Sequence, residues 1–190
     1  MSGILVLVVG PSGAGKDTLI HGAQLHLGGN GAFVFPRREI TRPADGRHER
    51  HVPVSEAAFE ARAANGAYAL SWRAHGLGYG VPRAIETDLT AGCHVVVNVS
   101  RGVIDEARAR FGEVAIFRVS VPEPVLRQRL LSRGREAVPD IEARIQRAAA
   151  YELNGHALNG HEVTTILNDG PPERAIEVFV DRLRAICGGD

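Results

Sequence analysis

The sequence predicts a three-layer α/β fold with a parallel core sheet. Apolar runs rich in β-branched residues recur along the chain, and segments with apolar residues at helical spacing separate them. Runs without polar alternation are typical of strands that are buried on both faces of a parallel sheet. Strands that alternate with helices favour helical layers on both sides of that sheet. We expect core strands at residues 4–9, 94–99, 114–121 and 163–167.

Length and charge limit the class of protein. A chain of 190 residues forms one domain, or one core with insertions. Its 22 basic and 22 acidic residues cancel, so we expect neither nucleic acid nor a membrane as a partner. Cys93 and Cys187 lie far apart in the chain, which is typical of a reducing compartment. Because the chain shows no signal peptide and no apolar run of about 18 residues, we expect a cytoplasmic protein. The sequence does not indicate an oligomeric state.

A glycine-rich loop follows the first predicted strand and precedes a helix that ends at Gly28. In this context a G-x-x-x-x-G-K pattern is typical of a P-loop, whose backbone N–H groups and helix N-terminus surround the phosphates of a nucleotide. We expect Lys16 to reach the terminal phosphates of ATP. The predicted nucleotide-binding residues are Gly10, Pro11, Ser12, Gly13, Ala14, Gly15, Lys16, Asp17 and Thr18.

One position of this loop departs from the usual pattern. Asp17 stands where a serine or threonine ordinarily binds Mg²⁺, and Thr18 follows it. A carboxylate is a hard oxygen ligand, so Asp17 or Thr18 is the predicted Mg²⁺ ligand. The alternative is that Asp17 only caps the helix.

Residues 37–51 carry five arginines and two histidines without a hydrophobic period. Next to a phosphate-binding loop, this composition favours a second anion site over a solvated loop. Residues 37–92 have the pattern of an insertion of small mixed elements, in which we expect a helix after Ser55 and a glycine-dense turn over 76–81. At the carboxyl end of the 94–99 strand, where open α/β sheets bind ligands, Asn98, Ser100 and Arg101 are candidate ligand contacts.

Arginines crowd the helix that Pro122 and Pro124 open and the segment after it. Such residues can simply favour the helix dipole. Phosphoryl transfer, however, needs cations over the transferred group, so we interpret residues 127–147 as a lid. We expect Leu130 and Leu131 to pack on one side of this helix. A last helix is expected to pack through Ala175, Val178, Val180, Leu183 and Ile186.

Motifs along nearly the whole chain fall in the order found in guanylate kinases. They are residues 10–18, Thr41-Arg42-Pro43, Val54-Ser55 before Phe59, His75-Gly76 before Tyr79-Gly80, Arg133-Gly134 and Asn168-Asp169. The chain therefore resembles that family. The resemblance implies a P-loop kinase domain over residues 1–190, an acceptor-binding subdomain inserted at 37–92, and an arginine lid.

The groups with which guanylate kinases recognise guanine are missing. Ser71 stands at the position of the first acidic base-reading residue, Val81 replaces the hydroxyl residue after Tyr-Gly, and residues 97–100 contain no carboxylate. On the phosphate side Arg42 and Tyr79 remain, while Arg38, Asp45 and His51 replace other residues of the family pattern. A site without hydrogen-bonding partners for a base discriminates poorly between bases.

These departures resemble the ribose 1,5-bisphosphate phosphokinases, guanylate-kinase relatives of phosphonate catabolism. The segments that carry this likeness are 10–17, 38–43 and 69–72. The resemblance implies that the γ-phosphoryl group of ATP is transferred, with Mg²⁺, to the 1-phosphate of ribose 1,5-bisphosphate, which gives 5-phosphoribosyl 1-diphosphate. A phosphate acceptor is already ionised, so no general base is needed.

The resemblance, with the positions in the chain, suggests roles for the site residues. We expect Arg38, Arg42, His51 and Tyr79 to bind the acceptor phosphate, and Asn98, Ser100 and Arg101 to contact the sugar. Arg129, Arg133 and Arg144 are expected to act with Lys16 on the γ-phosphoryl group, and Asn168 to lie near the nucleotide's ribose or adenine.

Two alternatives stay open. One is a guanylate kinase, or a nucleoside monophosphate kinase of relaxed base preference. The other is a non-catalytic guanylate-kinase-like module that binds partner peptides. Lys16 and the lid arginines argue against the second, because a binding module has no use for them.

Overall fold

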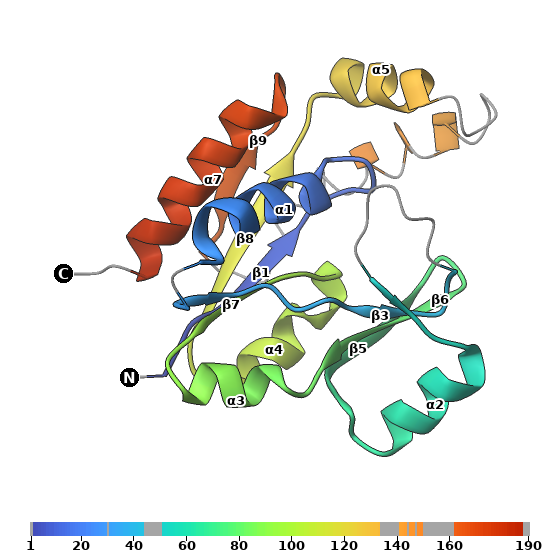
Figure 1. Cartoon of the computed structure of the whole chain (residues 1–190). Helices are drawn as coiled ribbons and strands as arrows, with labels where there is room; N and C mark the ends of the chain where they lie inside the picture. The colour runs from blue at the N-terminus through green and yellow to red at the C-terminus, as the bar shows by residue number, and fades with distance from the viewer. Residues whose placement is uncertain are drawn as a thin grey trace.

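The computed structural model describes residues 2–29, 31–43, 51–133, 141–143, 145–146, 148–149 and 162–187, with the backbone alone at Arg133 and Cys187. These residues form two sheets and the helices that cover them (Figure 1). The larger sheet has the order β2-β7-β1-β8-β9, and all four of its strand pairs are parallel. Its strands are β1 (Leu5–Val9), β2 (Phe33–Val34), β7 (His94–Asn98), β8 (Val114–Ser120) and β9 (Thr164–Leu167).

Helices cover both faces of this sheet. One face packs against α1 (Lys16–Leu27), α5 (Glu123–Arg133) and α7 (Pro172–Cys187). The other packs against α3 (Ile85–Thr90), the 3₁₀ turn η1 (Arg101–Val103) and α4 (Ile104–Arg110). Every residue of β1 is buried, and its side chains alternate between the two cores. This architecture is the three-layer parallel arrangement that the apolar runs predict.

The second sheet has the order β4-β3-β6-β5 and lies to one side of the larger sheet (Figure 1). Strand β3 runs parallel to β4, whereas β3–β6 and β5–β6 are antiparallel. Helix α2 (Glu56–Ala64) packs on this sheet, and the hydroxyl oxygen of Ser55 accepts a hydrogen bond from the Ala58 N–H (3.2 Å) as its predicted N-cap. The strands are β3 (Glu39–Ile40), β4 (Val52–Pro53), β5 (Tyr68–Ala74) and β6 (Leu77–Pro82).

The glycine-dense stretch 76–81 is a strand over most of its length, and the prediction of a turn there was wrong. Only His75 and Gly76 turn, both with positive φ, and β6 follows. Aromatic rings explain why glycines lie in this strand. A Cβ atom on Gly78 would lie 2.8 Å from the Phe59 ring, and one on Gly80 would lie 2.4 Å from the Tyr68 ring. These glycines admit rings to the sheet face and do not bend the chain.

Three further expectations needed correction. The polar stretch 37–51 contains β3, whose Glu39 is buried although nothing in the local pattern predicts a strand. Leu131 and Val178, which we expected to pack, are 52% and 44% exposed. On α7 the neighbouring Phe179 is buried instead and meets the Phe117 ring edge-on.

A histidine at the start of β7 makes the stability of the fold depend on pH. The Ile4 N–H donates to Nδ1 of His94 (3.1 Å), so this nitrogen has to be unprotonated. Burial lowers the pKa of His94 below its usual value near 6.5. The unfolded chain therefore binds the proton more readily, and this contribution to stability is complete above about pH 6.5 and is lost as the pH falls through the lowered pKa.

We therefore expect His94→Asn, which keeps an acceptor near the Nδ1 position, to be less sensitive to acid than the native chain. Urea unfolding at pH 7.5 and pH 5.5 measures this difference. An equal loss of stability in both proteins between these pH values would contradict the role of His94.

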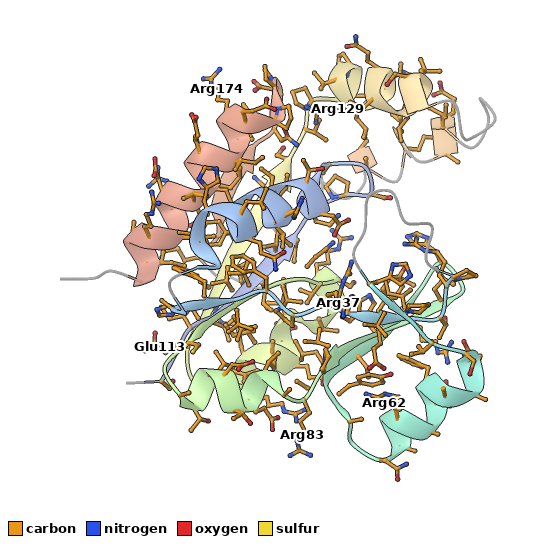
Figure 2. All side chains as sticks on the ribbon, viewed as in Figure 1. Arg37, Arg62, Arg83, Glu113, Arg129 and Arg174 are labelled. Carbon is orange, nitrogen blue, oxygen red and sulfur yellow. The ribbon has the colours of Figure 1, made fainter. Side chains whose placement is uncertain are left out.

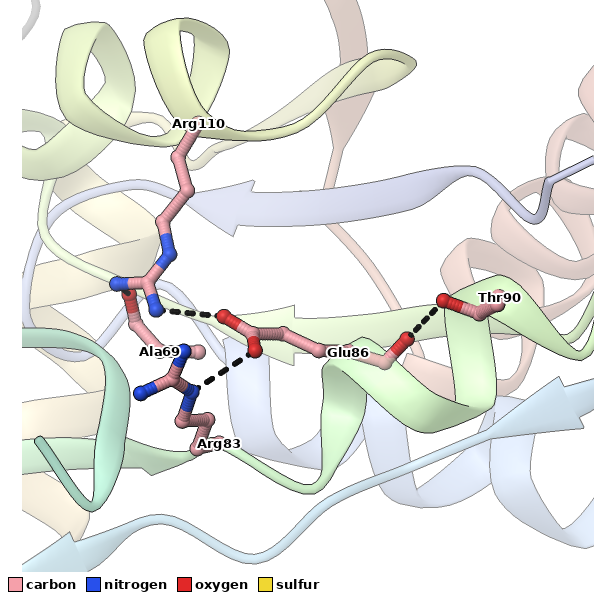
Figure 3. A network of polar contacts seen from close by, with 5 residues as sticks. All are labelled: Ala69, Arg83, Glu86, Thr90 and Arg110. Carbon is pink, nitrogen blue, oxygen red and sulfur yellow. Dashed lines mark hydrogen bonds and ion pairs between the residues drawn. The ribbon is translucent and has the colours of Figure 1, made fainter.

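A polar network joins the second sheet to the helices of the core (Figure 3). The Arg110 guanidinium at the end of α4 donates to the Ala69 carbonyl on β5 (2.7 Å) and to Glu86 on α3 (2.5 Å). Arg83 Nε donates to the other oxygen of the same carboxylate (2.9 Å). The hydrogen bond from Arg83, and then that from Arg110, lowers the pKa of Glu86. This network links the start of β5 to α3 and α4.

Replacement of Arg110 by alanine is expected to lower the free energy of unfolding by about 1–2 kcal/mol, because the Ala69 carbonyl and Glu86 both lose a donor. Urea titration measures this loss. Arg108→Ala is the matched control, since the Arg108 guanidinium lies exposed on the same helix with one long contact, 3.5 Å, to the Val114 carbonyl. Equal effects of the two substitutions would show that the network adds no stability.

Candidate active site

The glycine loop joins β1 to α1 at the carboxyl edge of the parallel sheet. Gly13 and Gly15 have φ of 91° and 93°, a left-handed conformation that side chains disfavour. A Cβ atom on Gly15 would also lie 2.4 Å from Nδ2 of Asn168. Gly15 is the N-cap residue of α1 and has no side chain that could cap the helix. The first-turn N–H groups of α1 therefore face a loop whose shape suits an anion.

Lys16 starts α1 and its side chain turns back over the loop. Its ammonium group donates to the carbonyls of Gly10 (2.8 Å) and Pro11 (2.9 Å). The positive charge is thereby held at the entrance of the loop. The lysine, the glycine backbone and the helix N-terminus together fit a polyphosphate.

Asn168 contacts the glycine loop, and Arg129 contacts Asn168. Asn168, after β9, is buried and donates from Nδ2 to the Ala14 carbonyl (2.7 Å). The Arg129 guanidinium on α5 donates to the Asn168 backbone carbonyl (3.0 Å), to its Oδ1 (3.3 Å) and to the Gly170 carbonyl (2.9 Å). Figure 2 shows Arg129 where α5 approaches the start of α7. In this structure Arg129 therefore ties α5 to the 168–170 loop, and its predicted contact with the γ-phosphoryl group stays a prediction.

The Asp17 carboxylate, in the first turn of α1, faces the neighbouring strand end and the second sheet. Its Oδ1 accepts a hydrogen bond from Nδ2 of Asn98 at the end of β7 (2.8 Å) and lies 3.6 Å from Nη2 of Arg38. Asp17 thus contacts two of the predicted substrate-binding residues.

Arg38 lies against the second sheet. The Arg38 side chain is 10% exposed, and its guanidinium carbon lies 5.9 Å from the centre of the Trp72 ring and 5.7 Å from that of Tyr79. The two rings stack on each other with centroids 5.3 Å apart and planes 2° from parallel. Arginine favours such aromatic faces, and its planar fork of N–H groups can pair with two oxygens of a phosphate. Arg38 and Tyr79, two of the predicted acceptor residues, are therefore in contact.

The remaining predicted residues lie around this centre. His51 is buried, and its Nε2 donates to the carbonyl of Arg42 (3.0 Å), so it supports the backbone of another predicted acceptor residue. Ser100 accepts from the Gly102 N–H (3.3 Å) and starts the η1 turn that contains Arg101. Thr18 is exposed on α1 next to Asp17.

Some of the predictions lie outside the described residues. These are Arg144, the Arg133 side chain, Asp45 and the other residues of 44–50, and positions 134–140 of the predicted lid. Among the described residues of the predicted lid, Arg127 pairs with Glu142 and Glu123. Ile141, Ile145 and Ala148 are buried in the core with α1 and α7.

Two residues that shape the site were missed by sequence reasoning. Glu39 on β3 accepts from the Tyr68 hydroxyl (2.6 Å) and from Arg62 Nε (2.8 Å). Trp72, one residue after Ser71, forms the stack that carries Arg38. The alternation of β5 offered a signal for Trp72, because it shares a strand face with Leu70.

In the part of the chain that the structure describes, no group of three or more histidine, cysteine or acidic side chains could hold a metal ion. Among the helices described, none is long and apolar enough to cross a bilayer.

The fold and the loop define the class of protein. The structure of guanylate kinase from Anaplasma phagocytophilum superposes with a TM-score of 0.70, covering 99% of this chain and 88% of that one at 20% identity. The chain therefore has the guanylate-kinase-like P-loop fold that its motifs predict. No model of a protein family matches the chain.

Sequence relatives define the family within that class. Ribose 1,5-bisphosphate phosphokinase PhnN of Methylobacterium radiotolerans is 42% identical over 97% of this chain and 99% of its own length. The protein of the same name from Acidiphilium cryptum is 52% identical over 86% of both chains. The chain belongs to the ribose 1,5-bisphosphate phosphokinase PhnN family, as predicted.

Longer proteins contain the same unit. The bifunctional ribose 1,5-bisphosphokinase-thymidine phosphorylase of Azorhizobium caulinodans is 41% identical over 97% of this chain, which spans 26% of that protein. The chain thus spans about a quarter of the length of such bifunctional relatives.

Proposed function

We propose that the chain transfers the γ-phosphoryl group of ATP to the 1-phosphate of ribose 1,5-bisphosphate, which yields 5-phosphoribosyl 1-diphosphate and ADP. One arrangement supports this most strongly: a basic acceptor side without base-recognition groups adjoins the phosphate-binding loop. Nη2 of Arg38 lies 3.6 Å from the carboxylate of Asp17, in the first turn of the helix that follows this loop. Ser71, in contrast, is exposed, and Val81 is fully buried in the core, where its side chain offers no hydrogen bond.

The chemistry needs position and charge. An oxygen of the 1-phosphate forms a bond to the γ-phosphorus, and the bond from that phosphorus to the β–γ bridging oxygen breaks, so ADP carries the electron pair away. The acceptor oxygen is already ionised, and no proton has to be removed. Lys16 and the loop N–H groups are proposed to hold the β- and γ-phosphates, and Arg38, Arg42, His51 and Tyr79 the acceptor.

Asp17 and Thr18 offer oxygen atoms that suit Mg²⁺ at the first turn of α1. When bound, the ion neutralises charge on the β- and γ-phosphates. We propose Arg129, Arg133 and Arg144 as further cations for the transferred group, and residues 127–147 as the lid that carries all three. Residues 37–92 are proposed as the acceptor-binding subdomain.

The test is a product assay by ³¹P nuclear magnetic resonance with Mg-ATP and either ribose 1,5-bisphosphate or GMP. We expect 5-phosphoribosyl 1-diphosphate from the first and no comparable ADP release with the second. Efficient phosphorylation of GMP would instead favour a nucleoside monophosphate kinase. ATP binding without turnover of either acceptor would reject both assignments.

A further inference from the structure

Asp17 is the point where the nucleotide loop touches the acceptor side. The same carboxylate oxygen accepts from Asn98 at 2.8 Å and lies 3.6 Å from Arg38 Nη2. These partners come from the end of β7 in the core sheet and from the residue before β3 in the second sheet. One side chain in the first turn of α1 therefore contacts both the end of β7 and the residue that precedes β3.

Arg38 has a restricted environment. Its side chain is 10% exposed and lies against the stacked rings of Trp72 and Tyr79. A flat aromatic surface fixes the plane of a guanidinium but lets it slide along the ring. The carboxylate of Asp17, 3.6 Å from Nη2, supplies an opposite charge that opposes such sliding. Removal of that charge also leaves a nearly buried cation with weaker compensation.

We propose that Asp17 is a positioning residue that holds Arg38 on the Trp72–Tyr79 stack, so that the acceptor phosphate meets its guanidinium at a fixed place relative to the phosphate-binding loop. This inference rests on the proposed function in one respect, namely that the acceptor carries a phosphate. It gives the unusual carboxylate of the loop a role that does not depend on a metal ion.

Tryptophan fluorescence tests this role without catalysis. Trp72 is the only tryptophan of the chain, so emission excited at long wavelength reports on the stack under Arg38. In EDTA and without nucleotide, we expect Asp17→Asn to raise the acrylamide quenching constant of Trp72, because a displaced Arg38 uncovers the ring. Glu177→Gln, which removes an exposed carboxylate from α7, is the matched control and is expected to change nothing.

Binding of the acceptor is measured under the same metal-free conditions by titration of Trp72 emission with ribose 1,5-bisphosphate. We expect Asp17→Asn to weaken this affinity at least about tenfold, because the negative charge beside the nearly buried Arg38 guanidinium is lost. Asp17→Glu, which keeps the charge, should recover part of the loss. In steady-state assays the KM for the acceptor should rise more than the KM for ATP.

The outcomes separate this role from others. One outcome is that Asp17→Asn and Glu177→Gln show the same quenching and the same metal-free acceptor affinity, and that Asp17→Asn weakens only the binding of Mg-ATP. Asp17 is then a metal ligand, and the inference is wrong. Increased quenching in Asp17→Asn, combined with no binding of ribose 1,5-bisphosphate by the native chain, supports the positioning of Arg38 and rejects the proposed substrate. Arg38→Lys is a second variant, which keeps the charge but loses the planar stack, and it too should expose Trp72 and weaken acceptor binding.

Discussion

Substitution of Lys16 by methionine is expected to reduce kcat/KM about 10³-fold while the protein stays folded. The ammonium group lies over the loop, within 2.8 Å and 2.9 Å of two loop carbonyls, and methionine keeps much of its length without its charge. Phosphoryl transfer depends on positive charge placed where negative charge develops, so this loss affects the transition state. Steady-state kinetics with Mg-ATP measure the effect, and thermal unfolding shows whether the variant folds.

The composition of the chain allows a second, independent check. Lys16 is the only lysine among 190 residues, so an amine-reactive reagent can modify it and otherwise only the N-terminal amine. We expect ATP to protect Lys16 from modification, as read by peptide mass spectrometry, while the N-terminal amine reacts equally with and without ATP. Unchanged labelling of Lys16 at saturating ATP, or full activity of Lys16→Met, would contradict the assignment of this loop to the nucleotide.

Local sequence patterns predicted the core strands, the glycine loop and the helix that follows it. The β1 run, the glycine loop and α1 are contiguous, so their geometry follows from neighbouring residues. The fold class and the family, predicted from the motifs, are confirmed by the guanylate kinase structure and the PhnN relatives. The roles of the single site residues stay predictions.

The second sheet was less predictable because its strands depend on distant partners. Strand β3 is two residues long and exists through pairing with β4 and β6. The glycines of β6 predict a turn when only the local sequence is considered. In the structure they leave room for the rings of Phe59 and Tyr68, which come from other elements. The contact between Asp17 and Arg38 likewise joins segments that no local period relates. Tertiary packing decided these cases.

Strand β6, which lies between β3 and β5 in this sheet, gives the largest expected effect on stability. Replacement of Gly80 by alanine should lower the free energy of unfolding by about 3 kcal/mol. Its Cβ atom would lie 2.4–2.7 Å from three atoms of the Tyr68 ring, which is rigid and has little room to move. Displacement of Tyr68 also breaks its 2.6 Å hydrogen bond to the buried carboxylate of Glu39.

The state of Tyr68 makes this loss measurable in a second way. Burial, and then the bond to Glu39, raises the pKa of Tyr68 to about 12. A displaced ring should titrate nearer its ordinary value, so ultraviolet difference spectra of Gly80→Ala should show this tyrosine ionising at lower pH than in the native chain. Urea unfolding measures the free energy itself. Gly112→Ala is the matched control, since a Cβ atom there meets nothing within 4 Å. Equal stabilities of the two variants would mean that the Tyr68 ring yields without cost, and the explanation of β6 as a strand kept open for aromatic rings would then fail.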